Sequence, residues 1–331
     1  MLRIFLTHEP EMLKNYYGAR AVAALRELGE LRINSTGHVL DAAALIREAR
    51  GCEIIVSDRQ TAGPAEVFAQ SPDLVAFLRV AVDIRNIDVP AASRAGVLVT
   101  HATPGFLASV AEMAIGFMVD LSRNITGAVT AYRADRAPEV RMGRQLNGAT
   151  VGIIGYGAIG AHLAPICLSL GMKVLISDPF KRVDEPALEQ VELPALLARS
   201  DYVVCLAVAN EQTENLMDAE AFARMKPSAF FINLSRGNLV DESALEHALD
   251  EKRVAGAAMD VGRAPDQRPS LRLARRSDVL ATPHIAGLTP DAAEHQAFDT
   301  VNQLRELVAG RIPPGAVNTE QAHRLKRLRK I

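Results

Sequence analysis

Residues 150–178 read TVGIIGYGAIGAHLAPICLSLGMKVLISD. A short apolar run, Val151 to Ile154, leads into a glycine-rich turn at residues 155–160. An apolar stretch of helical length follows, and a second apolar run ends at Asp178. This order predicts strand, tight turn, helix and strand, which together form one βαβ unit of a parallel sheet.

Each glycine of the turn Gly155-Tyr-Gly157-Ala-Ile-Gly160 has a physical role. Gly155 permits the tight turn, Gly157 lets the backbone approach a pyrophosphate closely, and Gly160 lets the helix pack against its strand. The N-terminus of the helix then offers N–H groups and a partial positive charge to phosphates. The turn therefore predicts a dinucleotide-binding site.

Asp178 indicates which dinucleotide is bound. It lies where a carboxylate can accept hydrogen bonds from both ribose hydroxyls. The same carboxylate should repel a 2′-phosphate, which favours NAD over NADP. Lys181 and Arg182 follow closely and weaken that preference.

Strand-like and helix-like segments alternate in two sets, before and after a long apolar helix that begins at Leu107. We expect strands at 3–7, 53–56, 76–82 and 97–100, and then at 151–154, 173–177, 202–206, 230–233, 255–259 and 279–281. We expect amphipathic helices at 19–28 and 41–49. A helix from about Pro290 to Val308, and the segment GRIPPGAVN with a short strand, should return the chain to the first set. The fold class is therefore α/β, with two Rossmann-like, doubly wound parallel-sheet domains.

The composition of the chain limits the kinds of partner that it can bind. The 331 residues carry a net charge of −2 and are 49% hydrophobic, so no global field attracts nucleic acid or a membrane surface. No apolar run reaches the ~20 residues of a membrane span, and MLRIFLTHEP is too short in its apolar run for a signal peptide. The three cysteines predict buried thiols in a reducing compartment, so we expect a cytoplasmic protein. The basic end HRLKRLRKI is suited to contact with an acidic partner, but it is more typical of a solvated helix end or a frayed terminus.

Suitable chemical groups follow three predicted strands of the second set. Arg236 comes after the strand at 230–233, Asp260 after the next, and His284 after the last. Ligands bind beyond the carboxyl ends of parallel strands. An arginine that grips a carboxylate and a histidine that moves a proton, both beside a nicotinamide, are what oxidation of a 2-hydroxy acid requires.

These segments resemble the D-isomer-specific 2-hydroxyacid dehydrogenases. The matching segments are VGIIGYGAIG, MKPSAFFINLSRGNLVDESAL, VAGAAMDV and VLATPHIAG, with NIDVPAASRAGVLVTHATPG and SVAEMAIGFMVDLSRNI upstream and GAVN near the end. The resemblance implies NAD as cofactor, a 2-keto or (D)-2-hydroxy acid as substrate, no metal, and a homodimer. It also implies a substrate domain of residues 1–102 and 287–331, and an inserted NAD domain of residues 103–286 with a dimerisation helix near 107–124.

Site residues transfer by the same resemblance. Arg236 matches the arginine that binds substrate and acts in catalysis, and His284 matches the acid–base histidine. The cofactor would be lined by the glycine turn and by Ala158, Ile159, Asp178, Leu234, Ser235, Arg236, Asp260, His284 and Gly287. In keto acid reduction, Arg236 would hold the carboxylate and polarise the carbonyl, and His284 would protonate the forming alkoxide.

The chain departs from the family beside His284. The family pairs its histidine with a glutamate shortly after the strand at 255–259, but no glutamate lies between Asp260 and His284. Asp266 can substitute, which is our hypothesis. Gln267 can instead take the place, as a glutamine does in the related formate dehydrogenases, or the role is empty. An empty role would suit an alternative function, an NAD(H)-binding regulatory or scaffold protein with weakened catalysis.

The second departure is in the substrate loop. Members usually carry glycines here, whose neighbouring amides bind the substrate carboxylate, but Ala81 and Asp83 replace them and Arg85 adds a charge. We expect Val82, Asp83 and Arg85 to contact substrate. Arg85 is either a structural partner of Asp83 or Asp88, or it remodels the pocket with His101 for a more anionic substrate.

Overall fold

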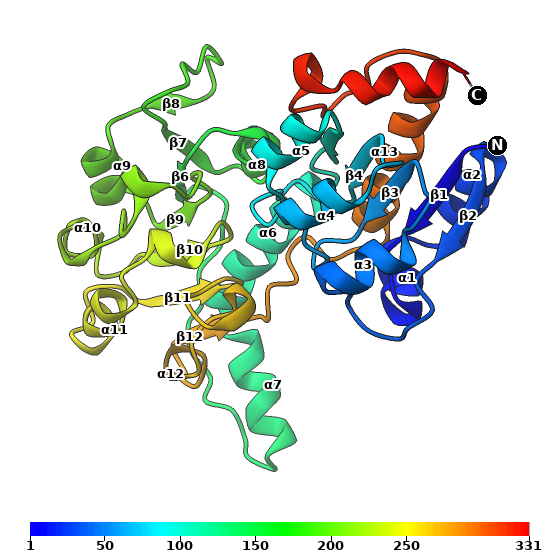
Figure 1. Cartoon of the computed structure of the whole chain (residues 1–331). Helices are drawn as coiled ribbons and strands as arrows, with labels where there is room; N and C mark the ends of the chain where they lie inside the picture. Colours follow the sequence, from blue (N-terminus) through cyan, green and yellow to red (C-terminus); the bar gives the residue numbers. More distant parts are fainter. Residues whose placement is uncertain (331) are drawn as a thin grey trace. The chain divides into compact units, whose positions relative to one another are not determined.

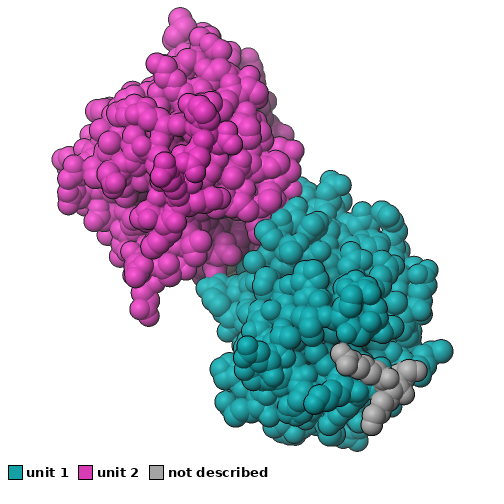
Figure 2. Space-filling view, turned by 90° about the horizontal axis from the view of Figure 1, so that it is seen from above, with its two compact units in different colours: residues 1–105, 289–331 teal, residues 106–288 magenta. Residues whose placement is uncertain are grey.

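The structure is a computed structural model that describes residues 1–330, apart from the side chains of Asp266, Arg329 and Lys330. The chain forms two compact units (Figure 2). Unit 1 is Met1–Gly105 with Thr289–Ile331, and unit 2 is Phe106–Leu288. Each is an α/β unit on a parallel sheet (Figure 1), which confirms the predicted fold class.

Unit 1 has a five-stranded sheet in the order β2-β1-β3-β4-β5, with every pair parallel. The strands are β1 (Arg3–Leu6), β2 (Glu30–Ile33), β3 (Ile54–Ser57), β4 (Ala76–Arg79) and β5 (Leu98–His101). The helices are α1 (Pro10–Tyr16), α2 (Ala19–Leu28), α3 (Ala42–Glu48), α4 (Ala65–Gln70), α5 (Val89–Ala95) and α13 (Pro290–Val308).

Successive strand residues of unit 1 enter different cores, as the pleat requires. Ile4 packs with α2 and α13, whereas its neighbour Phe5 packs with α3, α4 and α5. Helices therefore cover both faces of this sheet. The α13 side is closed by Ala297, Val301 and Leu304, which come from the far end of the sequence.

The C-terminal segment is held against unit 1, while His323, Lys326 and Arg327 stay exposed, so its described residues form the predicted solvated helix end and not a frayed terminus. Short 3₁₀ turns η4 (Thr319–Gln321) and η5 (His323–Lys330) follow α13. Arg324 donates to the carbonyls of Ser71 and Leu74 at 2.9 Å. The buried Asn318 accepts from the Val99 amide at 2.8 Å. Basic residues here satisfy unpaired carbonyls, which a charge pattern alone does not reveal.

Unit 2 has a seven-stranded parallel sheet in the order β12-β11-β10-β9-β6-β7-β8. The strands are β6 (Thr150–Ile154), β7 (Lys173–Ser177), β8 (Glu189–Gln190), β9 (Tyr202–Cys205), β10 (Phe230–Asn233), β11 (Gly256–Met259) and β12 (Val279–Ala281). The helices are α6 (Leu107–Arg123), α7 (Ile125–Arg133), α8 (Ala158–Ser169), α9 (Leu193–Arg199), α10 (Ala219–Arg224), α11 (Glu242–Asp250) and α12 (Leu271–Ala274), with 3₁₀ turns η1 (Glu211–Thr213), η2 (Gly237–Leu239) and η3 (Pro265–Gln267).

Helices α6 and α8 close one face of this second sheet, and α9, α10 and α11 close the other. Val110, Ala114 and Met118 of α6 are buried in that packing. By contrast, α7 buries no residue and projects from the rest of unit 2 (Figure 1). No helix among the described residues is long and apolar enough to cross a bilayer.

Most predicted elements are confirmed, and the differences are instructive. The short strands β2 and β8 were not predicted, and neither were the helices α1, α4, α5, α7, α9, α10, α11 and α12. Only Gly29 separates α2 from β2, so the two elements share one continuous pattern. The strand predicted at 76–82 ends at Arg79. The strand expected in GRIPPGAVN is only a single bridge between Thr100 and Ala316.

Candidate active site

The glycine turn of unit 2 has the geometry that its spacing predicts. Gly155 has φ +92°, and a Cβ there would lie 2.7 Å from the backbone of Ala207. A Cβ on Gly160 would overlap the Gly155 carbonyl oxygen, so α8 packs tightly on the turn. Gly157 is the N-cap of α8, and nothing lies within 4 Å of where its Cβ would be. The space over Gly157 therefore fits a pyrophosphate at the helix N-terminus.

The start of α8 adds to that fit. No side chain caps this N-terminus among the described residues, so helix geometry leaves its first N–H groups available to an anion. Ala158 is exposed at the first turn, whereas Ile159 is half-buried and packs against the core.

Asp178 stands at the end of β7, as predicted, and organises the neighbouring loops. Its Oδ2 accepts from the Tyr156 amide at 2.8 Å, and its Oδ1 accepts from the amides of Phe180 and Lys181 at 2.9 and 3.0 Å. A carboxylate has about four acceptor positions, so capacity for a ribose hydroxyl is left on Oδ2. The Lys181 ammonium lies 5.1 Å from the centre of the Tyr156 ring.

The loop that carries Arg236 is fixed by short polar side chains. Asn233 is fully buried at the end of β10, donates to the Arg236 carbonyl at 3.0 Å and accepts from the Ser235 amide at 3.1 Å. Ser235 Oγ donates to the Ala207 carbonyl at 2.5 Å, in the segment that Gly155 touches. Arg236 is half-buried, and its guanidinium donates to the Ser235 carbonyl at 2.8 Å.

The loop that carries His284 depends on Asp260. The Asp260 side chain is buried and accepts from Thr282 Oγ1 at 2.6 Å and from the amides of Ile285 and Ala286 at 2.8 Å. Its carbonyl accepts from the His284 amide at 2.9 Å. His284 has φ +61°, a conformation that such anchoring must maintain. Asp260 therefore acts on this loop, and its predicted contact with a cofactor stays a prediction.

The Arg236 and Asp260 loops touch each other. A Cβ on Gly237 would overlap the Gly262 backbone, so only glycine lets the two backbone segments approach this closely. Arg263 ties them further. Its guanidinium donates to the Val240 carbonyl at 3.0 Å, and to Glu214 at 2.8 Å and Asn215 at 2.5 Å. Sequence reasoning missed this arginine because its partners come from separate loops.

Leu234 and Gly287 contribute mainly to packing. Leu234 is buried in the core beneath α6 and α8. Gly287 is half-buried, and a Cβ there would lie 3.1 Å from the Phe106 Cβ. Their proximity to a cofactor stays a prediction.

The segment that replaces the family glutamate forms the 3₁₀ turn η3. The side chain of Asp266 lies outside the described residues. Gln267 has φ +56°, its carbonyl accepts from the Gly262 amide at 2.9 Å, and its buried Oε1 has no hydrogen-bond partner within the described part of the chain. All three possibilities stated above therefore stay open.

The substrate loop belongs to unit 1. Arg85 pairs with Asp83 through two parallel hydrogen bonds, Nε to Oδ1 at 3.0 Å and NH2 to Oδ2 at 2.6 Å. Asp88 instead caps α5. The structure thus gives Arg85 the predicted partner Asp83. Val82 is 38% exposed, and His101 directs Nδ1 to the Ala102 carbonyl at 2.9 Å.

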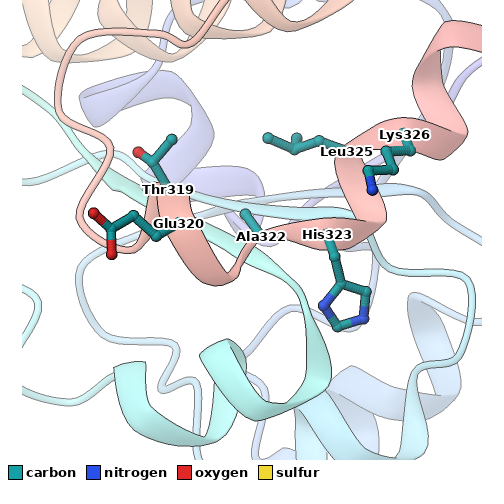
Figure 3. A pocket seen from close by; sticks show the side chains of 6 residues that line it. All are labelled: Thr319, Glu320, Ala322, His323, Leu325 and Lys326. Atoms are coloured by element: carbon teal, nitrogen blue, oxygen red, sulfur yellow. The ribbon is translucent and has the colours of Figure 1, made fainter.

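Unit 1 also has two surface hollows. One, of about 330 Å³, is lined by Arg59, Asp83, Arg85 and Asn86. The other, of about 260 Å³, is lined by Thr319, Glu320, Ala322, His323, Leu325 and Lys326 of the C-terminal segment (Figure 3). The His323 ring lies against Gly96, which identifies the second hollow as part of the anchoring of that segment.

Comparisons with known proteins agree with this architecture. The family described as "D-isomer specific 2-hydroxyacid dehydrogenase, NAD binding domain" matches residues 115–286. A D-3-phosphoglycerate dehydrogenase of Synechocystis sp. is 35% identical over 244 residues, which are 72% of this chain but only 44% of that protein. An (S)-sulfolactate dehydrogenase of Chromohalobacter salexigens is 33% identical over 91% of this chain and 98% of its own length.

A solved structure shares the fold. It is a Polaromonas sp. protein described as a D-isomer specific 2-hydroxyacid dehydrogenase, with a TM-score of 0.86 at 24% identity, and the match covers 96% of this chain and 99% of that one.

Proposed function

This chain belongs to the family of D-isomer-specific 2-hydroxyacid dehydrogenases, and from that premise we propose that Arg236 and His284 carry its reaction. The protein is an NAD-dependent oxidoreductase that interconverts a 2-keto acid and a (D)-2-hydroxy acid. Bound NADH supplies a hydride to the carbonyl carbon of the keto acid. The rest of the step, binding of the carboxylate and delivery of a proton, falls to side chains of this chain.

Arg236 suits the first task. Its planar guanidinium can hold a carboxylate through two parallel hydrogen bonds, and it stays charged throughout the physiological pH range. The carbonyl oxygen of the same substrate then lies near a positive charge, which favours the alkoxide that forms as hydride arrives. The interlocked Asn233 and Ser235 hold the backbone that presents this side chain.

His284 suits the second task. An imidazole can both donate and accept a proton, so one proton can pass to the alkoxide oxygen in reduction and return in oxidation. The keto acid thereby gains a hydride at carbon and a proton at oxygen, which balances the reaction. The observation that carries the proposal is the anchoring of this loop by the buried Asp260 carboxylate and of the adjoining loop by Asn233.

We propose Asp266 as the partner of the His284 ring. A carboxylate there would orient the imidazole and favour its charged form, as the missing glutamate would. The variant Asp266→Asn should lower kcat and shift the acid–base pKa of the pH–rate profile, with NADH affinity preserved. Unchanged kinetics would exclude Asp266, and an effect of Gln267→Ala instead would favour the glutamine.

Steady-state NADH consumption tests the function directly. Suitable substrates are glyoxylate, pyruvate, hydroxypyruvate, and branched and aromatic keto acids. His284→Asn should lower kcat by roughly 10² to 10⁴ while NADH binding persists. Arg236→Gln should chiefly raise KM for the keto acid. The exposed His247→Asn and Arg253→Gln on the same unit are matched controls. NADH binding without turnover of any acid would favour the regulatory or scaffold alternative.

The substrate class can be narrowed. The two relatives reported above are named for phosphoglycerate and sulfolactate, and both of these acids carry a second anionic group. We propose that the substrate of this chain does so too, and 3-sulfopyruvate and 3-phosphohydroxypyruvate therefore join the panel.

We also propose that the protein is a cytoplasmic homodimer. Cys52, Cys167 and Cys205 are free and buried, and burial raises the pKa of the last two to about 12, as expected for inert thiols in a reducing compartment. Helix α7 and the segment after it expose apolar side chains that a second copy would cover, namely Ile125, Val129, Tyr132, Val140 and Met142. In analytical ultracentrifugation, the double variant Val129→Ser, Tyr132→Ser should sediment as a monomer. A double variant that still sediments as a dimer would contradict this interface.

A further inference from the structure

A buried carboxylate lies behind the loops of the candidate active site in unit 2. Glu242 is the first residue of α11 and is only 8% exposed, although glutamates are seldom buried without a partner. Its own helix does not need it, because Asp241 caps α11 by accepting from the amides of Ser243 and Ala244 at 2.9 and 3.1 Å. The contacts of Glu242 with another segment therefore explain its burial.

Glu242 reaches across to the segment that follows β11. Its Oε1 accepts from the Arg263 amide at 2.9 Å, and it lies 2.9 Å from where a Cβ on Gly262 would be. The first turn of a helix favours a negative charge, which offsets part of the cost of burying the carboxylate. One side chain thus ties the start of α11 to the backbone of the neighbouring loop.

The loop that it holds is a small hairpin around η3. Two amides of the first arm donate across it, Gly262 to the Gln267 carbonyl at 2.9 Å and Ala264 to the Arg268 carbonyl at 3.0 Å. Arg263 lies between these two donors, and in an extended arm its amide faces away from the hairpin. The carboxylate on α11 is the acceptor for that amide, so it fixes the hairpin from outside the hairpin's own hydrogen bonds.

This hairpin carries both candidate partners of the His284 ring. Asp266 and Gln267 belong to η3, at its tip. Gln267 has φ +56°, a backbone conformation that persists only where the surrounding structure maintains it. The anchor on α11 therefore bears on the element from which the His284 ring would be oriented.

The run of chain that leads into α11 also carries Arg236. It leaves β10, passes through η2 and touches the hairpin at two points. One is the close approach of Gly237 to Gly262, and the other is the hydrogen bond to Glu242. Two contacts fix both the position and the direction of the hairpin relative to this run, whereas a single contact would let it pivot.

We propose that Glu242 is a positioning residue for proton transfer, which holds the η3 hairpin so that the partner of the His284 ring is presented in one orientation. Glu242 acts through the backbone of Gly262 and Arg263. The inference rests on the proposed function, because it requires that His284 moves the proton and that a residue of η3 orients its ring.

Kinetics of three Glu242 variants test the proposal. Glu242→Ala removes the acceptor, so kcat should fall roughly tenfold and the acid–base pKa of the pH–rate profile should shift, with NADH affinity preserved. Glu242→Gln keeps an acceptor of the same length and should recover most of kcat. If Glu242→Ala does not fold, Glu242→Asp, which retracts the carboxylate by one methylene, replaces it in every comparison.

The exposed Glu220→Gln is the matched control, since it removes the same charge from the first turn of another helix of unit 2, α10. It should change neither kcat nor the pH–rate profile. An unshifted profile in Glu242→Ala, or an equal shift in Glu220→Gln, would overturn the proposal.

A double-variant cycle separates positioning from a general loss of stability. Glu242→Ala is combined with Asp266→Asn or Gln267→Ala, whichever alone shifts the profile. If Glu242 acts through that partner, the double variant should lose no more kcat than the more severe single variant, whereas independent effects multiply. Multiplied losses, or no shift from either partner variant, would contradict the assigned role.

A measurement without turnover separates this proposal from the function it rests on. Amide hydrogen exchange over residues 262–268, followed by mass spectrometry, should be faster in Glu242→Ala than in the wild type and in Glu220→Gln, while exchange in β10 and β11 is unchanged. If no keto acid oxidises NADH, the proposed function fails, and this exchange result still decides whether Glu242 holds the hairpin. Unchanged exchange over residues 262–268 would overturn the inference even in an active enzyme.

Discussion

The carboxyl edges of the two sheets hold their functional groups in different ways. In unit 2, the loops after β10 and β11 are positioned by glycines and by short buried side chains, such as Asn233 and Asp260. In unit 1, the loops after β3 and β4 surround a buried guanidinium, Arg79, and the charges at the surface are paired side chains. The arrangement in unit 2 holds the backbone of the loops in place, whereas the arrangement in unit 1 holds charged side chains in place. Four experiments test this contrast.

The largest effect should come from Asp260→Ala in unit 2. The variant leaves two amides and a hydroxyl without their buried acceptor, each at a cost of about 1–3 kcal/mol. Because these bonds hold the His284 loop, kcat should fall by roughly 10² or more. Single-turnover kinetics and chemical denaturation measure both effects. Full activity would show that the loop does not need its anchor.

In unit 1, stability should depend on pH through His8. Burial lowers the pKa of His8 from its ordinary value near 6.5 to about 4. The nearby Asp58 carboxylate favours the charged ring and offsets part of this effect. Between these values the unfolded chain binds the extra proton. The free energy of unfolding therefore has its full value above about pH 6.5 and decreases toward pH 4, by up to about 3 kcal/mol.

Urea unfolding from pH 7.5 to 4.5 measures this slope. His8→Gln should flatten it, and the exposed His38→Gln serves as the control. The same slope in the His8 variant would show that the ring titrates as it does in water.

A smaller effect is expected at the turn of unit 2. Gly157→Ala meets open space, so the fold should tolerate it, but the added methyl group stands where the pyrophosphate approaches. NADH affinity, followed by fluorescence, should weaken roughly tenfold. Gly116→Ala also meets open space, at an exposed position of α6, and should leave affinity unchanged. Equal affinities would move the dinucleotide away from this turn.

The smallest effect should follow Arg263→Gln. The variant loses bonds to Val240, Glu214 and Asn215, but the side chain is 38% exposed, so solvent offsets part of the loss. The keto acid KM should rise about five- to tenfold through the Arg236 loop, with NADH binding preserved, and Arg263→Lys should recover part. Arg253→Gln is the matched control. A change in NADH affinity alone would assign Arg263 to the cofactor side.

Much of unit 2 could be predicted because its signals are local. The apolar runs of β7 and β10 and the glycine turn are each readable within a few residues. The helix α13 was predicted with its observed bounds, since Thr289-Pro290 is a strong start signal and the Thr289 side chain does cap it.

The charge cluster of unit 1 could not be predicted, because its contacts are non-local. Arg79 stands at the end of an apolar strand, and nothing adjacent indicates that its partners are carbonyls at positions 58 and 61. Arg263 is similar, since residues 214, 215 and 240 meet it only in the fold. The pairing of Arg85 with Asp83 could be predicted because the two residues are only two positions apart in the sequence.

The position of α13 has a consequence for biosynthesis. One side of the unit 1 sheet is closed by Ala297, Val301 and Leu304, which leave the ribosome only after all of unit 2. Unit 2 is contiguous and can complete its core during translation, while the nascent first 105 residues wait with an uncovered apolar face. This interval exposes the chain to aggregation and to chaperones, because α13, which is made after unit 2, completes a domain whose strands are made before it.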